Sequence, residues 1–252
     1  METVVRFSER ALRGNPRAQD QQASGLQGRK LGWFSKRILR GWIKSTPLEY
    51  LMGMVVSMAG LQDFPNTFTT GQALRAGVHP RILYAWRNDG DVVELSRGVF
   101  RRADALPASY PDFLAVAFRV PLAVVCLIAA ARVHDLTDEI PPAVQIAVPR
   151  GGTRPRIHYP PVEVFQFDAL TFDLGISSIE AALGEPIRIY SPERTVVDLL
   201  RLRARIGEPT GFIALRRYLE RRGARPGEVL ELARALDCLG PVRTAIDVLE
   251  AS

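Results

Sequence analysis

Apolar residues recur at helical spacing in three consecutive segments before residue 90. The first segment, Leu48 to Gly60, is apolar on most faces and predicts a buried helix. Thr69 stands three residues before Gln72, which is the spacing of a capping box, and a short helix is therefore expected over Thr70 to Ala76. Gly77 supplies the left-handed residue that ends this helix.

The third helix has a start and a stop signal of its own. His79 can cap it, Pro80 suits its first position because the missing N–H costs nothing there, and Gly90 follows its end. Two helices joined by a tight glycine turn are typical of a helix-turn-helix unit.

This third helix is two-sided. Its apolar stripe is formed by Ile82, Leu83 and Trp86. Its other side carries the polar residues Arg81, Tyr84, Arg87 and Asn88. The polar side is of a kind that can enter the major groove of DNA.

A strand–turn–strand pattern follows the third helix. Val92 to Leu95 and Val99 to Arg102 predict two short strands around the turn Ser96-Arg97-Gly98, with an arginine at its tip. In this position the hairpin is expected to form a wing, so that guanidinium groups on helix and wing reach phosphates and guanine edges together.

The net charge of +6 lies entirely in residues 1–51, which hold ten basic and four acidic residues. Residues 71–102 carry six arginines against three acids, which is a modest excess. Modest charge predicts modest affinity per monomer, and hence a homodimer or cooperative binding on repeated half-sites. Two alternatives remain: the arginines only solvate the domain surface, or the winged helix docks a protein.

From residue 111 the pattern becomes mixed α and β with a helical C-terminal third. Helices are expected over Phe113–Val120, Leu122–Val133, Ser191–Arg205, Gly211–Arg222, Pro226–Leu236 and Pro241–Leu249. Strands are expected over Val144–Val148, Val162–Phe167 and Ile187–Tyr190. The predicted fold class is α+β. The chain is expected to comprise a basic, disordered leader (1–46), a winged helix-turn-helix DNA-binding domain (47–105) and an α+β domain (111–252).

Few catalytic classes fit this composition. The only lysines are Lys30, Lys36 and Lys44, so residues 52–252 cannot supply the lysine of a P-loop, a pyridoxal enzyme or a kinase. Charged residues around Glu193, Arg194 and Asp198 are explained by capping and an i, i+4 ion pair. His134 beside two aspartates makes no complete metal-ligand set.

We therefore expect no enzyme, cofactor or metal. The alternative hypothesis is that the chain is a phosphoryl- or nucleotidyl-transferring enzyme that uses Glu193, Asp198 and His134.

The remaining signals concern location. Cys126 and Cys238 sit in apolar surroundings and are expected to be packed thiols in a reducing cytoplasm. The apolar run Phe113 to Ala131 contains Arg119 and Pro121, which oppose membrane insertion, so buried helices are expected rather than a membrane span. A basic amphipathic stretch near Trp33 has two interpretations, a surface-binding helix and a loosely ordered leader.

An ordered set of short motifs resembles the AbiEi family of bacterial type IV antitoxins. The matching segments are Phe68–Ala73, Gly90, Arg97–Arg101, Cys126-Leu127, His134–Thr137, Ala147–Arg150 and Ser191–Leu199. The resemblance spans about residues 48–250. This chain departs from the family pattern at Ala129, where serine is usual, and at Asp135, where glycine is usual.

The resemblance implies a transcriptional autorepressor that binds inverted repeats at its own promoter on double-stranded DNA. It further implies a second domain that counters a cognate nucleotidyltransferase-type toxin, not necessarily by direct contact. By position, the residues expected to face DNA are His79, Arg81, Tyr84, Arg87, Arg97 and Arg101. The family-motif residues expected to be structural are His134, Glu193, Arg194 and Asp198.

Overall fold

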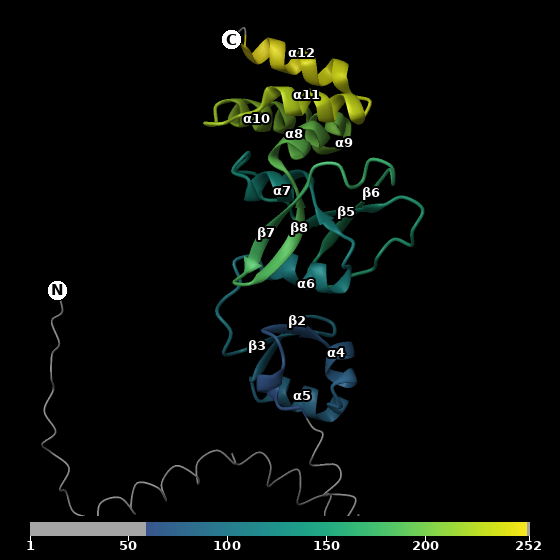
Figure 1. Ribbon diagram of the computed structural model, residues 1–252, viewed down its shortest axis with the longest axis vertical. Helices are drawn as coiled ribbons and strands as arrows, with labels where there is room; N and C mark the ends of the chain where they lie inside the picture. The colour runs from purple at the N-terminus through teal and green to yellow at the C-terminus, as the bar shows by residue number, and fades with distance from the viewer. Residues whose placement is uncertain (1–58, 251–252) are drawn as a thin grey trace, which may run out of the picture. The chain divides into compact units, whose positions relative to one another are not determined.

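The computed structural model describes residues 59–250, which all belong to one compact unit (Figure 1). The predicted leader (1–46) and nearly all of the helix predicted over Leu48 to Gly60 lie outside the described residues. The fold is mixed α and β, with two sheets in the described part. None of the helices between residues 59 and 250 has the length and apolar content needed to cross a bilayer.

A small sheet and two short helices form the first part of the described chain. Its elements are the 3₁₀ turn η2 (Leu61–Asp63), β1 (Thr67–Thr69), α4 (Thr70–Arg75), α5 (Pro80–Asn88), β2 (Val92–Ser96) and β3 (Val99–Arg102). The strands are antiparallel in the order β1-β3-β2. An apolar cluster that includes Phe68, Leu83 and Phe100 lies between sheet and helices.

The local signals read from the sequence are confirmed here. Thr69 Oγ1 accepts from the Gln72 amide, and the Gln72 side chain accepts from the Thr69 amide at 2.7 Å, which completes the capping box. His79 Nδ1 caps α5 by accepting from the Arg81 amide. Strand β1 was not expected, because three residues carry too little period-2 pattern to stand out.

The second sheet has five strands in the order β6-β5-β4-β8-β7. Its strands are β4 (Val124–Val125), β5 (Val144–Pro149), β6 (Val162–Phe167), β7 (Ile176–Ala182) and β8 (Glu185–Tyr190). Pairs β5–β6 and β4–β8 are parallel, and the others are antiparallel. Helices α6 (Pro111–Arg119) and α7 (Leu127–Val133) pack against it.

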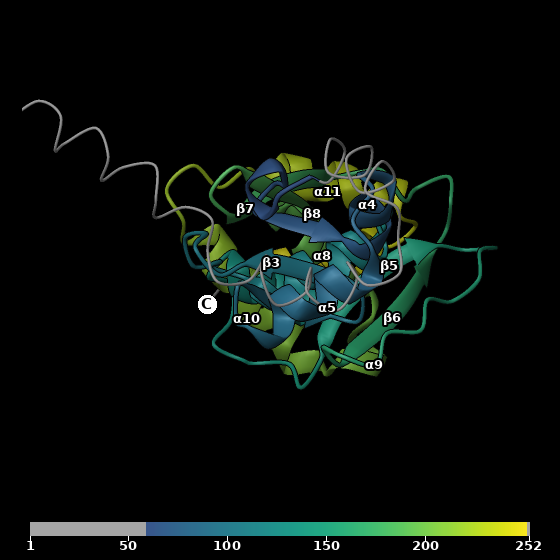
Figure 2. The ribbon, with the colours of Figure 1, turned by 90° about the horizontal axis from the view of Figure 1, so that it is seen from below.

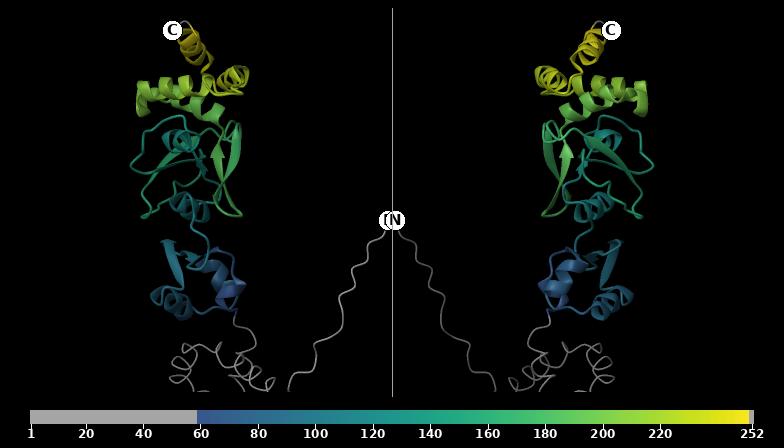
Figure 3. Two further views of the ribbon diagram at one scale, coloured as in Figure 1. Left: turned by 90° about the vertical axis from the view of Figure 1, so that its left-hand side faces the viewer. Right: turned by 90° about the vertical axis from the view of Figure 1, so that its right-hand side faces the viewer.

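Both faces of this sheet are covered. Ile146 and Val148 of β5 join a cluster with Val116 of α6, whereas Ala147 faces the helical end of the chain. β5 and β6 were predicted within a residue of their observed bounds: β5 is buried on both faces and reads as a nearly continuous apolar run, whereas β6 is an edge strand whose apolar residues are interrupted by Glu163 and Gln166. Helix α6 contacts both sheets, and Figure 3 shows it between them.

Two predictions for this region are wrong. Residues 122–126 are not helical: Val124 and Val125 form the central strand β4, and the helix begins only at Leu127. Strand β7 was missed altogether. For β4 the structure is decided by pairing over a long sequence distance, because Val125 pairs with Ile189, whereas β7 pairs with the next strand, β8, in a hairpin.

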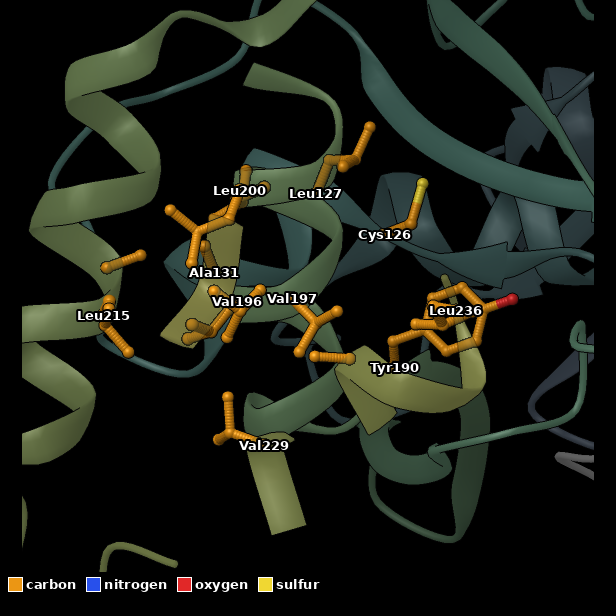
Figure 4. Close-up of a cluster of buried hydrophobic side chains, with 14 of the residues drawn as sticks. Cys126, Leu127, Ala131, Tyr190, Val196, Val197, Leu200, Leu215, Val229 and Leu236 are labelled. Carbon is orange, nitrogen blue, oxygen red and sulfur yellow. The ribbon is translucent and has the colours of Figure 1, made fainter. Parts of the chain in front are cut away.

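The chain ends in a helical layer, as expected. Its helices are α8 (Pro192–Arg201), α9 (Arg203–Ile206), α10 (Glu208–Leu219), α11 (Pro226–Ala235) and α12 (Leu239–Glu250). Figure 4 shows the centre of its core, where Val196 and Val197 of α8 lie among side chains from α7, α10 and α11. Cys126 and Cys238 are both unpaired and buried, and burial raises the pKa of each thiol.

A buried ion-pair network holds α8 to the chain before the β7–β8 hairpin. Arg194 is fully buried, and its Nε donates to Asp198 Oδ2 at 2.9 Å. Its Nη1 donates to the carbonyls of Thr171 and Leu174, and Arg201 donates to the other oxygen of Asp198. Gly175 makes room for this arginine, since a Cβ there would lie 2.7 Å from the Arg194 Cβ.

Removing the charge of Asp198 should therefore destabilise the protein strongly. Asp198→Asn leaves the Arg194 guanidinium buried without a counter-charge, and we expect a loss of about 3–5 kcal/mol in the free energy of unfolding. Urea unfolding followed by circular dichroism measures it. The matched control is Asp173→Asn, whose carboxylate is 82% exposed and pairs with Arg188. Equal losses in the two variants would contradict this role for Asp198.

Candidate nucleic-acid interface

Helix α5 presents one apolar and one polar side. Leu83 is buried, while Ile82 and Trp86 are partly buried against the small sheet. Arg81 and Tyr84 are exposed, at the i, i+3 spacing that keeps them on one side. The helix packs against β2. Figure 2 labels α5 and β3 in the view from below. The predicted division of this helix into two faces is confirmed.

The β2–β3 turn (Ser96 to Gly98) is fixed by hydrogen bonds on both sides. Gly98 has a φ of +77°, and its carbonyl accepts from the Thr70 amide at the start of α4 at 2.9 Å. Its amide donates to Glu94 Oε1 at 3.1 Å. Both the amide and the carbonyl of Gly98 are therefore held, so Arg97 is carried on a firmly held turn.

Glu94 also reaches α5. Its Oε2 accepts from Arg87 Nη1 at 2.9 Å, and the same guanidinium lies 4.9 Å from the centre of the Tyr84 ring. Arg87 therefore links the helix to the strand before the turn. Arg87 was expected to face DNA. Its guanidinium already pairs with the Glu94 carboxylate, although Arg87 remains exposed.

A hollow of about 390 Å³ lies where the turn, α5 and the start of α4 meet. The residues that line it are Thr69, Thr70, Gly71, Tyr84, Arg97, Gly98, Val99, Phe118 and Arg119. Tyr84 and Arg97, predicted from helix and turn separately, therefore border one concave surface. Phe118 and Arg119 come from the end of α6.

The structure contradicts the prediction that Arg101 faces DNA. The side chain is buried, with 6% of the residue exposed. Its guanidinium pairs with Glu185 and donates to Thr67 Oγ1 at 2.7 Å and to the Leu106 carbonyl at 2.6 Å. The prediction is wrong because a partner 84 positions away along the chain binds this arginine.

Three of the six arginines between residues 71 and 102 thus have carboxylate partners: Arg87 with Glu94, Arg101 with Glu185 and Arg102 with Asp104. The others, Arg75, Arg81 and Arg97, are exposed, and their side chains have no hydrogen bond or ion pair within residues 59–250. His79 is exposed too, with Nδ1 engaged in capping. Among these six arginines, the positive charge without a carboxylate partner in residues 59–250 is therefore at Arg75, Arg81 and Arg97.

The family-motif residues of the second part all make contacts that hold elements together. His134 Nε2 donates to the Tyr190 carbonyl at 2.7 Å. Glu193 accepts from the Tyr218 hydroxyl at 3.0 Å and from Arg225 at 3.1 Å. With the Arg194–Asp198 pair, these contacts agree with a structural role for the four residues. Within residues 59–250, no three His, Cys, Asp or Glu side chains gather as metal ligands do.

Sequence reasoning missed Arg119 as a candidate for this surface. It stands in an apolar run, where the sequence shows only that it opposes membrane insertion. Its Nη1 donates to the Arg97 carbonyl at 3.0 Å, a contact between segments 22 positions apart. The sequence signal that could have identified Arg119 was its place at the exposed C-terminal end of a predicted helix.

Neither a comparison with models of protein families nor one with curated proteins gave a match to this chain.

Replacing Arg101 should lower stability more than replacing an exposed arginine. Arg101→Met leaves Glu185, whose side chain is only 13% exposed, without its counter-charge, and we expect a loss of about 3 kcal/mol. Arg87→Met is the matched control, because it removes an exposed pair and should cost much less. Urea unfolding of both variants compares them. If the two losses are alike, Arg101 does not act as a buried clamp.

His134 should make stability depend on pH. Burial lowers the pKa of His134, the nearby Arg221 lowers it further, and the hydrogen bond to the Tyr190 carbonyl opposes the shift. In the unfolded chain the imidazole binds a proton at about pH 6.5, so the unfolded state takes up more protons than the folded state below that pH. Stability is therefore fully present above the unfolded pKa and is lost as the pH falls below it.

His134→Gln tests this dependence, because glutamine can donate a hydrogen bond but does not titrate. Urea unfolding at intervals from about pH 7.5 to pH 5 should give a flatter profile for the variant than for the parent protein. Parallel profiles would show that His134 contributes nothing to the pH dependence.

Proposed function

We propose that this chain is a non-enzymatic antitoxin and transcriptional autorepressor. It binds operator DNA through a winged helix made by α4, α5 and the β2–β3 hairpin, and it counters a nucleotidyltransferase-type toxin. In this proposal α5 enters the major groove, and the β2–β3 turn contacts the neighbouring backbone. The predicted first helix of this unit lies outside the described residues.

One observation carries the proposal: Tyr84 on the exposed side of α5 and Arg97 at the tip of the turn line the same hollow. A duplex that contacts one of them is then within reach of the other. The strand order β1-β3-β2, with α4 and α5 between β1 and β2, also fits a winged helix. Unpaired guanidinium groups supply the charge that phosphate contact requires.

The antitoxin part of the proposal rests on the resemblance in the second domain. Cys126-Leu127, His134 to Thr137 and Ser191 to Leu199 are the segments that carry it there. These segments meet in one core: Cys126, Leu127, Leu136 and Val196 belong to the same apolar cluster. Motifs that pack together in this way support a family scaffold rather than scattered coincidences.

Arginine substitutions test DNA binding. We expect the double variant Arg81→Ala with Arg97→Ala to weaken binding to DNA from upstream of the chain's own gene. The slope of log affinity against log salt concentration should fall by about 1.8, since each lost phosphate contact removes about 0.9. Fluorescence anisotropy between about 50 and 200 mM salt gives both quantities.

The control is the double variant Arg222→Ala with Arg234→Ala. It removes the same net charge from exposed positions on the turn after α10 and on α11. Equal affinity and slope in all three proteins would remove Arg81 and Arg97 from the DNA interface. Absence of DNA binding by the parent protein would reject the repressor proposal. A growth assay with a co-expressed nucleotidyltransferase from the neighbouring gene tests the antitoxin activity separately.

A further inference from the structure

The hollow beside the β2–β3 turn is built from four chain segments, and two of them bring an arginine. Arg97 comes from the turn, and Arg119 from the C-terminal end of α6. Both residues are exposed. No aspartate or glutamate is among the residues that line this hollow. Two cations that share a concave surface without a carboxylate favour an anion as the ligand.

A hydrogen bond links Arg119 to the backbone of Arg97. Arg119 Nη1 donates to the Arg97 carbonyl at 3.0 Å, which leaves its Nε and Nη2 without a hydrogen-bond partner in the described part of the chain. Helix α6 contacts both β2 and β3. Ser96, which precedes Arg97, donates from its hydroxyl to the Tyr159 carbonyl at 2.6 Å. The Arg97 backbone and the Arg119 guanidinium are thus held near each other before any ligand arrives, whereas the Arg97 side chain makes no hydrogen bond in the described part of the chain.

We infer that Arg119 extends the DNA-binding surface onto the second domain, and that one phosphodiester of the duplex lies between Arg97 and Arg119. A guanidinium group matches phosphate geometry better than an ammonium group does. Tyr84 lines the same hollow from the exposed side of α5, so a backbone that follows α5 passes over Arg119. This inference rests on the proposed DNA binding and adds a contact from outside the winged helix.

The contact has a specific signature. A phosphate contact fixes the protein on the duplex and carries no base information. Arg119→Ala should therefore weaken binding to operator and to random DNA by the same factor, about threefold to tenfold, and lower the salt slope by about 0.9. Arg119→Lys should keep most of the slope, because the charge is retained. Fluorescence anisotropy on both DNAs across a salt series measures these effects.

Arg222→Ala is the matched control, since Arg222 is exposed and lies outside the hollow. Thermal melting checks that Arg119→Ala folds like the parent protein. If the parent binds DNA and Arg119→Ala behaves like Arg222→Ala, the inference fails and the proposed function stands. If the parent binds no DNA, both fail.

A different ligand would give a different pattern. If inorganic phosphate or ATP binds the parent protein, and Arg119→Ala abolishes that binding without changing DNA affinity, the hollow is a small-anion site and the inference is overturned. Isothermal titration calorimetry with each of the two anions detects this outcome.

Discussion

Arg101 is the residue on which the arrangement of the proposed interface depends. Strand β3 carries its guanidinium inward, where it meets Glu185 on β8, Thr67 on β1 and the Leu106 carbonyl. A buried ion pair costs desolvation, and it is maintained only when further hydrogen bonds satisfy the charged groups. Here one side chain joins two strands of the small sheet to the edge hairpin of the larger sheet.

The β2–β3 turn lies at the other end of β3 from Arg101, and it is also held in place. Helix α6 packs against β2 and β3, and its last residue, Arg119, lies against the Arg97 carbonyl. The turn is therefore supported by α4 through Gly98, by α5 through Glu94 and by α6 through Arg119. A turn held from three sides loses little conformational entropy on binding, which favours a defined contact over a flexible one.

Local signals in the sequence were sufficient for the helices of the interface. The Thr69–Gln72 capping box, the His79 cap and the left-handed glycines are all encoded within a few residues, and each is observed as expected. The side of α5 that carries Arg81 and Tyr84 follows from the helical period alone. Short-range physical chemistry decides these features.

Long-range pairing was not readable from the sequence, and it changed the predicted site in two places. Arg101 follows the period of an exposed strand end, yet Glu185 binds it. Arg119 interrupts an apolar run without any local partner, yet it borders the hollow with Arg97. Strand β4 was not predicted for the same reason, because its two residues form a central strand only by pairing with β5 and β8. In each case the deciding neighbour lies at least 21 positions away in the chain.

Within the proposed function, the unpaired arginines of the described winged-helix region bear on how tightly one chain binds DNA. Between residues 71 and 119 of the described part, Arg75, Arg81, Arg97 and Arg119 have no carboxylate partner, and four phosphate contacts from them would correspond to a salt slope of about −3.6. Proteins with strong operator affinity make roughly twice as many such contacts. Two copies on an inverted repeat would double the slope and would add the benefit of local concentration. The neutralisation of Arg87, Arg101 and Arg102 by carboxylates therefore argues, within the proposed function, for cooperative binding over tight binding by a single chain.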